Sequence, residues 1–383
     1  MFSLHIDTAR TWRGGQNQVL LTVNGLREIG QRAALVAHPD GELRKRAAEG
    51  LDLIPLAPRS EMDLTAAWRL ARVIKRLAPD VVHAHDPHGV AMASLALSLS
   101  GASAPRPAGT GVRAFVASRR VDFHLKKNAF SKWKHRQVDM FICASEAIRL
   151  MLVADGFPAE RTLTVHEGID LEHVVAAPPV NLHEALWLPH HAPIVGSVAA
   201  LVPHKGQRHL IEAAHLVVQQ IPDARFVILG EGELREHLEK LVKEYHLEKH
   251  VLLPGFRTDI LGCIKAFDLF VMSSVTEGLG TSLLDAMACS KAIIATRAGG
   301  IPEVVDDGMT GLLVGARDHH AMAAAIVRLL NDDGERRRMG AAGLTRLRER
   351  FTLERMVAGT AALYERLAGT PRAAGTARLS EGG

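Results

Sequence analysis

The chain has 383 residues, a formal net charge of +4, 47% hydrophobic residues and 4% aromatic residues. One hydrophobic core rarely serves so long a chain, so we expect two domains. The apolar content excludes a disordered protein, and the small net charge gives no indication of a nucleic-acid partner. Three widely spaced cysteines exclude a disulfide framework and a cysteine-ligated zinc site, which favours a reducing compartment such as the cytoplasm. No apolar run approaches the length of a membrane span.

The first half of the chain alternates short β-branched runs with segments of helical period. The runs predict strands at Ser3–Asp7, Ala33–Ala37, Asp52–Leu56, Val81–Ala84, Arg113–Ala117, Met140–Ala144 and Thr162–Val165. Between them, helices are predicted at segments such as Gln16–Ile29 and Leu64–Leu77. Strands that alternate with helices predict a parallel sheet with helices on both faces.

A proline-rich segment, Val174 to Pro193, interrupts this alternation and predicts a linker between two domains. Beyond it, strands are predicted at Ile194–Val198, Phe226–Leu229, Val251–Leu253, Leu269–Met272, Ala292–Ala295 and Leu312–Val314, with a helix at Leu234–Tyr245. The final residues carry no apolar period, which is typical of a disordered tail. We therefore predict a Rossmann-like domain over residues 1–175, a linker over 176–193, a second Rossmann-like domain over 194–366 and a disordered tail over 367–383.

The predicted fold is α/β, with two doubly wound domains that face each other across a cleft. Ligands of open α/β sheets bind beyond the carboxyl ends of the strands, so the loops that follow the predicted strands are where site residues are expected. Gly14 and Gly15 open a helix after the first strand, where free backbone N–H groups favour an anion. An ordinary tight turn is the alternative for this glycine pair.

Three histidines, His83, His85 and His88, lie at the end of the strand predicted at Val81–Ala84. His83 and His85 alternate with apolar residues, so both point to the same face of the sheet. No acid or third ligand accompanies them at a known spacing, so no metal site is predicted. We expect His83 to be a buried, hydrogen-bonded histidine, and His85, at the carboxyl end of the strand, to be a candidate functional residue.

Lys205 lies in a Lys-Gly turn between a predicted strand and an amphipathic helix. Its ammonium group could meet a phosphate as a point charge, and the alternative is a solvated lysine of the turn. One lysine does not decide between the two interpretations.

The stretch VTEGLGTSLLDAM, from Val275 to Met287, places an acid on each side of a glycine-rich turn. The glycines let the backbone approach a ligand, and Thr281 begins a helix whose first N–H groups can bind a phosphate. Glu277 would accept hydrogen bonds from sugar hydroxyls, and Asp285 from a vicinal diol such as a ribose. The alternatives are a solvated loop acid and a charge at the start of a helix.

Together these residues resemble glycosyltransferase family 4, whose members have the GT-B fold and retain the anomeric configuration. The likeness runs from Gly14-Gly15 through HAHD and PHKG to EGLGTSLLDAMACSKAIIATRAGGIPEVV, which is the most specific stretch. It implies that the N-terminal domain binds the acceptor and the C-terminal domain the nucleotide-sugar donor, with a UDP-sugar expected and no further cofactor. The sequence contains no Asp-x-Asp motif, so no metal is expected at the diphosphate.

The resemblance also implies roles for single residues. The expected catalytic residues are His85 beside the reacting sugar carbon, Lys205 on the diphosphate and Glu277 on the transferred sugar. The expected substrate-binding residues are Gly14, Gly15, Arg257, Gly278, Leu279, Gly280, Thr281 and Asp285, the last of these on the ribose.

Two positions depart from the family pattern. Asp285 stands where the family usually has a glutamate, and Ala200 where it usually has an arginine. Losing that arginine removes a strong bidentate partner of the diphosphate. Either Arg13, Arg208 or Arg257 replaces it, or the donor is held weakly.

The expected reaction moves a sugar from a nucleotide diphosphate sugar to an acceptor hydroxyl, in the synthesis of cell-envelope glycan, lipopolysaccharide or glycolipid. Two alternatives are a nucleotide-sugar-binding protein that has lost turnover and an enzyme similar to the UDP-sugar 2-epimerases. Turnover of the donor would separate these functions.

A basic segment lies between Ser118 and Arg136, with seven lysines or arginines and a single acid, Asp122. One interpretation is a solvated helix. Phe123, Phe130 and Trp133 fall on one helical side, so the other interpretation is a helix that lies on an anionic membrane. The acceptor would then be a lipid or another anionic molecule, and the protein would bind peripherally to the cytoplasmic face of the plasma membrane. The lysines expected to make this contact are Lys126, Lys127, Lys132 and Lys134.

Overall fold

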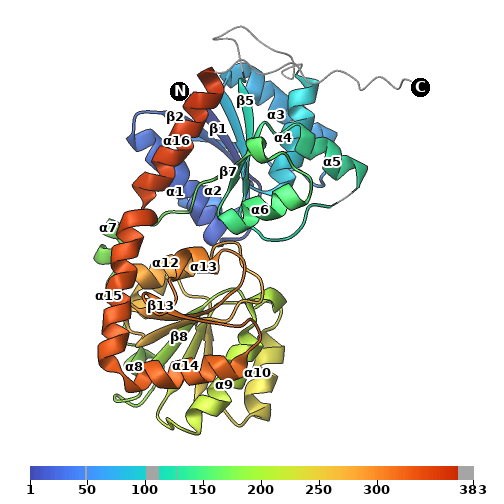
Figure 1. Ribbon diagram of the computed structural model, residues 1–383. Helices are drawn as coiled ribbons and strands as arrows, with labels where there is room; N and C mark the ends of the chain where they lie inside the picture. Colours follow the sequence, from blue (N-terminus) through green and yellow to red (C-terminus); the bar gives the residue numbers. More distant parts are fainter. Residues whose placement is uncertain (48–49, 101–111, 127, 370–383) are drawn as a thin grey trace, which may run out of the picture. The chain divides into compact units, whose positions relative to one another are not determined.

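A computed structural model of the chain describes residues 1–47, 50–100, 112–126 and 128–369 (Figure 1). The chain divides into two compact units. The first unit combines residues 1–166 with the C-terminal segment that begins at Leu353, and the second is continuous from Glu167 to Thr352. None of the helices in the described ranges is both long and apolar enough to cross a membrane. The cleft expected between the two domains stays a prediction.

The first unit is a parallel sheet with helices packed against it. Its strands are β1 (Phe2–Asp7), β2 (Arg32–Ala37), β3 (Asp52–Pro55), β4 (Val81–Ala84), β5 (Ala114–Arg119), β6 (Met140–Cys143) and β7 (Thr162–Thr164). Its helices are α1 (Gly14–Glu28), α2 (Glu42–Arg46), α3 (Leu64–Leu77), α4 (Pro87–Leu99), α5 (Ala129–Arg136), α6 (Glu146–Ala154), the short 3₁₀ turn η1 (Ala159–Arg161) and α16 (Leu353–Gly369). The strand order is β3-β2-β1-β4-β5-β6-β7, so the direction of winding reverses between β1 and β4.

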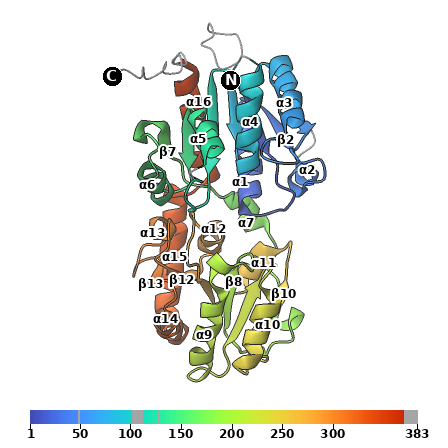
Figure 2. The ribbon, with the colours of Figure 1, turned by 90° about the vertical axis from the view of Figure 1, so that its right-hand side faces the viewer.

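Local sequence explains how these elements form. All six residues of β1 are buried, as expected for a strand covered on both faces. Asp63 caps α3 by accepting from the backbone N–H of Ala66, and Asp86 caps α4 in the same way. Helices α3 and α4 pack side by side against the sheet (Figure 2).

The second unit repeats the same plan. Its strands are β8 (Ile194–Val198), β9 (Arg225–Leu229), β10 (Val251–Gly255), β11 (Leu269–Met272), β12 (Ala292–Thr296) and β13 (Gly311–Val314). Its helices are α7 (Leu171–Ala176), α8 (Leu182–Ala185), α9 (Gln207–Val218), α10 (Arg235–Glu244), α11 (Ile260–Lys265), α12 (Thr281–Ala288), α13 (Ile301–Val304), α14 (His319–Asn331) and α15 (Asp333–Arg350), with the 3₁₀ turn η2 (Pro203–Lys205). The parallel strands follow the order β10-β9-β8-β11-β12-β13, which reverses between β8 and β11.

The boundaries between the units differ from the predicted ones. Helix α16 belongs to the first unit, because its apolar side chains, including Val357 and Tyr364, lie in that unit's core. The predicted domain end at 366 and the predicted tail over 367–383 are thus corrected at residues 367–369, which continue α16; residues 370–383 lie outside the described part. The predicted linker 176–193 belongs to the second unit, where Val180 N–H donates to the Gly262 carbonyl at 3.1 Å.

Candidate functional site

Both sheets bring polar side chains to the point where their strand order reverses. In the first unit, His5 lies on β1 and His85 directly follows β4. In the second unit, Lys205 lies in the loop after β8, and Glu277 in the loop after β11. Ligands of open α/β sheets bind at such switch points, so each unit carries one candidate site.

Lys205 and Glu277 form an ion pair in the second unit. The Lys205 Nζ lies 2.5 Å from Glu277 Oε2, which also accepts from Ser274 Oγ at 2.9 Å. The two charged side chains are 19% and 10% exposed, so both are largely withdrawn from water while a ligand can still reach them. The structure therefore brings together two of the three residues predicted to be catalytic.

A glycine explains how the lysine loop comes so close to the glutamate loop. Gly206 has φ +64°, a left-handed conformation that favours glycine. A Cβ at this position would lie 2.3 Å from the Ser273 carbonyl oxygen, so any side chain would push the two loops apart. Ser273 Oγ in turn donates to the carbonyl of Lys205 at 3.0 Å.

A second glycine pair holds the backbone of Glu277. Gly300 N–H donates to the Glu277 carbonyl at 3.1 Å, and a Cβ on Gly299 would lie 1.8 Å from that same oxygen. These two glycines lie in the stretch that resembles the family, but no role is predicted for them from the sequence. Their position directly after β12 is the signal that could have revealed it, because loops after parallel strands meet at the same edge of the sheet.

The loop from Gly278 to Gly280 leads into α12, which begins at Thr281 as predicted. Gly280 caps this helix with φ +91° and offers no side chain to its first N–H groups. Asp285, one turn further on, is half-buried, and burial raises the pKa of its carboxyl group to about 7. No hydrogen bond from the described residues opposes this rise. A helix start without a side-chain cap and a desolvated carboxyl group suit a ligand that brings both an anion and hydroxyl groups.

Two further buried polar atoms around this site have no partner within the described residues: Thr276 Oγ1 and Gln207 Oε1. Thr276 precedes Glu277, and Gln207 is the second residue after Lys205. The Gln207 side-chain amide donates to the carbonyl of Ala200 at 2.8 Å, which fixes its oxygen in place. Buried polar atoms are nearly always paired, so these two atoms mark the surroundings of the ion pair as a place for a polar ligand.

Two of the arginines predicted to replace the one missing at position 200 are engaged in other contacts, and the third belongs to the other unit. Arg257 makes two hydrogen bonds to Asp259, at 2.8 and 2.5 Å, and Arg208 donates to Glu212 at 3.1 Å. Arg13 lies in the first unit, at the residue before α1. Their predicted role at the diphosphate stays a prediction.

In the first unit, His85 belongs to a chain of hydrogen bonds. A terminal guanidinium nitrogen of Arg120 lies 3.1 Å from His85 Nδ1. Because a guanidinium group can only donate, His85 Nδ1 must be the acceptor. The proton of His85 therefore sits on Nε2, which donates to His5 Nδ1 at 2.9 Å. By the same logic His5 Nε2 donates to Ser3 Oγ at 3.0 Å, so the imidazole protons of His85 and His5 are both assigned.

His83 joins the same cluster and confirms its prediction as a buried, hydrogen-bonded histidine. Its Nδ1 lies 2.5 Å from the Tyr364 hydroxyl, and its Nε2 lies 2.8 Å from Ser118 Oγ. Burial, together with nearby positive charge, lowers the pKa of His5 to about 3 and those of His83 and His85 well below 6.5. The three imidazoles are thus neutral at physiological pH.

Sequence reasoning missed His5 and Arg120 in this cluster. They lie on β1 and just after β5, and only the pairing of β1 and β5 with β4 brings them to His85. Gly15, in the first turn of α1, also reaches this place, since a Cβ on it would lie 3.8 Å from Arg120 Cδ. Gly14 begins α1 as its first residue, and no side chain caps this helix.

The basic segment differs from its predicted form. Helix α5 covers only residues 129–136 of it, and Lys134 is buried, with its ammonium 2.9 Å from Glu61. Phe130 and Trp133 stack on each other and are half-buried, whereas Phe123 lies outside the helix. Lys134 is therefore not available for the membrane contact expected of it, because its ammonium group ties α5 to the loop before α3. Lys127 lies outside the described residues.

Comparison with known proteins gives two family matches. A model described as glycosyltransferase family 4 matches residues 12–173, and one described as glycosyl transferases group 1 matches residues 181–346. The first match covers most of residues 1–166 and continues to residue 173 in the second unit, and the second match lies within the second unit.

Individual relatives extend over most of the chain. EpsD of Bacillus subtilis, which is named as a glycosyltransferase, is 31% identical over 78% of this chain and 81% of its own length. LpsE of Rhizobium meliloti, named as a lipopolysaccharide core biosynthesis glycosyltransferase, is 28% identical over 89% of this chain and 92% of its own. The crystal structure of HepE from Anabaena, in complex with UDP and glucose, matches with a TM-score of 0.81 and 20% identity, over 96% of this chain and 100% of HepE.

Proposed function

We propose, from the premise that the chain belongs to glycosyltransferase family 4, that it transfers a sugar from a UDP-sugar to an acceptor hydroxyl with retention of configuration. The chain has the GT-B fold, with two parallel-sheet α/β units. The observation that carries the proposal is the Lys205–Glu277 pair beside the uncapped start of α12, at the switch point of the second sheet.

The donor site follows from the charges around that pair. The leaving diphosphate gains negative charge as the sugar departs, and Lys205 and the first N–H groups of α12 stabilise that charge. Glu277 accepts hydrogen bonds from the hydroxyls of the transferred sugar, and Asp285 accepts from the ribose diol. This mechanism needs no metal ion, because a lysine and backbone dipoles supply the positive potential.

Retention places attack and departure on one face of the sugar. The bond between the anomeric carbon and the diphosphate oxygen breaks, and the acceptor oxygen forms a bond to the same carbon from the same side. The departing phosphate oxygen takes the proton of the acceptor hydroxyl, so no protein base is required. The family resemblance implies that His85 acts beside the reacting sugar, and within the first unit this histidine is neutral and held by Arg120 and His5.

Donor binding is tested by thermal shift and calorimetric titration with UDP, GDP, ADP and their glucose and N-acetylglucosamine conjugates. UDP and its sugars are expected to stabilise the wild-type chain, and UDP is expected to bind the Lys205→Ala variant more weakly. Lys240→Ala, a change at an exposed lysine of α10, is the matched control. If no nucleotide binds, the proposal is contradicted. If a nucleotide sugar binds but no UDP is released in the presence of any acceptor, the protein has lost turnover.

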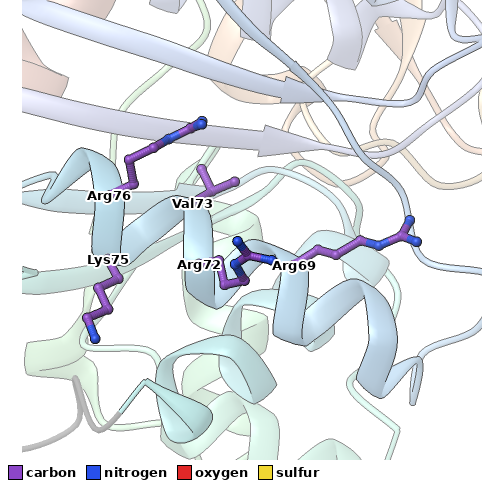
Figure 3. A pocket seen from close by; sticks show the side chains of 5 residues that line it. All are labelled: Arg69, Arg72, Val73, Lys75 and Arg76. Atoms are coloured by element: carbon purple, nitrogen blue, oxygen red, sulfur yellow. The ribbon is translucent and has the colours of Figure 1, made fainter.

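We also propose that the acceptor is presented at an anionic membrane surface and that α3 makes the contact. Four cations, Arg69, Arg72, Lys75 and Arg76, project around a depression of about 540 Å³ on this helix (Figure 3). The helix contains no acid, and its Trp68 and Leu64 side chains are 53% and 61% exposed. Exposed apolar side chains beside cations that form no ion pair with the described residues favour the interface of an anionic bilayer.

Vesicle co-sedimentation tests this contact. Cations near such a surface contribute about 1 kcal/mol each, so changing all four to glutamine is expected to weaken binding to phosphatidylglycerol vesicles by roughly two to three orders of magnitude. A second variant tests the basic segment that the sequence predicts to contact the membrane. It changes three exposed cations in and before α5: Lys126, Lys132 and Arg136. The set Lys240, Lys243 and Lys249 in the second unit is the matched control. Unchanged binding of the α3 variant, or equal binding to neutral phosphatidylcholine, would contradict the proposal.

A further inference from the structure

A second histidine cluster lies in the second unit, where α9 and α14 pack side by side (Figures 1 and 2). His209 and Glu212 lie one turn apart on α9, and His319 is the first residue of α14. The ligand atoms of these three residues lie within 4.8 Å of one another. The donor site proposed above uses none of them.

The geometry of the cluster fits a single ion. Glu212 Oε2 lies 2.8 Å from His209 Nδ1 and 3.6 Å from His319 Nδ1. Bonds of roughly 2.0–2.1 Å in a tetrahedral site put neighbouring ligand atoms about 3.4 Å apart, and the two observed separations bracket that value. Small rotations of the side chains would therefore complete the site.

The carboxylate is held in the orientation that such a site needs. Arg208 Nε donates to the other oxygen, Glu212 Oε1, at 3.1 Å, which leaves Oε2 facing both imidazoles. The three side chains are between 13% and 34% exposed, which leaves a route for the ion and a fourth position for water.

We propose that His209, Glu212 and His319 bind one divalent transition-metal ion of the zinc type. Two imidazole nitrogens and one carboxylate oxygen are the ligands that Zn²⁺ accepts, whereas Mg²⁺ and Ca²⁺ require oxygen ligands. The ion ties the first turn of α9 to the first turn of α14. Because α9 follows the Lys205–Gly206 turn directly, the ion also anchors the helix next to the proposed donor site.

The other histidine cluster among the described residues does not offer the same chemistry. His5, His83 and His85 also lie within 4.8 Å of one another, but they are buried and Arg120 donates to His85. A cation there would meet a fixed positive charge and would break hydrogen bonds that have no access to water. The cluster between α9 and α14 is therefore the better metal site of the two.

Zinc binding to the tag-free full chain tests the proposal, in the absence of any nucleotide. We expect one Zn²⁺ per chain by elemental analysis, unaffected by millimolar Mg²⁺. His209→Ala and His319→Ala are each expected to lower the affinity on the order of a hundredfold, since even second-shell changes lower it ten- to a hundredfold. The control is His215→Ala, a half-buried histidine two turns further along α9.

A second variant and a second readout guard against misfolding. Glu212→Gln keeps an oxygen near His209 but removes the charge, and it is expected to weaken zinc binding in a chain with an unchanged circular dichroism spectrum. Co²⁺ in the wild-type site is expected to give the visible absorption of a tetrahedral complex, which His319→Ala abolishes. Absence of stoichiometric zinc in the wild type, or wild-type affinity in the His209 and His319 variants, would overturn the proposal whether or not the chain transfers a sugar.

Discussion

The two sheets reverse their strand order in the same way, yet their switch points hold opposite kinds of side chain. The first holds three neutral imidazoles whose nitrogens are paired with one another or with neighbouring side chains. The second holds a charged pair, an uncapped helix start and the desolvated carboxyl group of Asp285. The shared topology therefore determines where in each sheet a ligand can bind. The loop residues determine whether the polar groups at that switch point are paired with one another or are available to a charged ligand.

The same contrast sets opposite responses to pH. The pKa values of the buried histidines are lower in the folded chain than in the unfolded one, so their contribution to stability is present above about 6.5 and is lost as the pH falls. The pKa of Asp285 is higher in the folded chain, so its contribution is present at low pH and is lost as the pH rises from 3.8 to about 7. Acid destabilises the first unit through its histidines, and neutral pH destabilises the second through this aspartate.

The largest expected effect is on the charged pair. Removal of one electrostatic group that meets developing charge costs roughly a hundredfold to a thousandfold in rate, so Lys205→Ala and Glu277→Ala are each expected to slow sugar transfer by at least that much. The double variant is expected to lose little more than either single variant, because the two residues act as a unit. Release of UDP is the measurement, with circular dichroism to verify the fold. Turnover at the wild-type rate in a folded Lys205→Ala chain would remove the pair from the mechanism.

His85 tests the other side of the comparison. His85→Ala is expected to lower the rate of transfer about tenfold to a hundredfold through misplacement of the reacting groups, with UDP affinity unchanged. His88→Ala, an exposed histidine three residues on, is the matched control. A loss of UDP affinity in the His85 variant would show that the two switch points do not have separate tasks.

Asp285 combines two effects of opposite sign. Asp285→Asn is expected to weaken UDP binding roughly ten- to a hundredfold, since a hydrogen bond to a charged group contributes roughly 1.5–3 kcal/mol. It is also expected to stabilise the free chain above pH 7, by at most about 4 kcal/mol for a carboxyl group whose pKa rises from 3.8 to about 7. Thermal unfolding of both proteins at pH 4 and pH 8 checks the second effect, which should vanish at the lower pH. If the wild type and the Asp285→Asn variant bind UDP with equal affinity, Asp285 does not contact the nucleotide and is only a charge near the start of a helix.

The smallest expected effect is on the support of the histidine cluster. Tyr364→Phe removes the hydroxyl beside His83 Nδ1 and leaves a buried nitrogen without a partner, which costs about 1–3 kcal/mol of unfolding free energy. The only other tyrosine, the half-buried Tyr245, supplies the matched Tyr245→Phe control. Urea denaturation measures the difference. Equal stability of the two variants would mean that the hydroxyl does not hold the cluster.

The strand series and the switch-point loops could be predicted from the sequence because both are local patterns. Short β-branched runs bounded by turn residues located β1 to β13 to within about two residues, and Lys205 and Glu277 followed from their places after strands. The pairing of His85 with His5 and Arg120 is non-local. The spacing of residues 5, 85 and 120 in the sequence does not predict their contact, because the contact depends on which strands become neighbours in the sheet.

The errors have a similar cause. The pattern of α16 was read as the end of the nearest domain, since sequence proximity is the only guide before the packing is known. Lys134 is expected at the membrane surface because lysines are rarely buried. Its burial depends on Glu61, which lies 73 residues earlier in the chain.

The return of α16 to the first unit makes the second unit an insertion within the first. During synthesis, residues 167–352 leave the ribosome as a continuous unit with its own core, while the first sheet still lacks its last helix. Gly25 and Val357 meet across α1 and α16 so closely that a Cβ on Gly25 would lie 2.4 Å from a Val357 methyl group, and Tyr364 closes the histidine cluster. Chains that end prematurely after residue 352 are left with an open apolar face on α1 and an incomplete switch point. The order of the chain thus delays completion of the first unit until α16 has been synthesised.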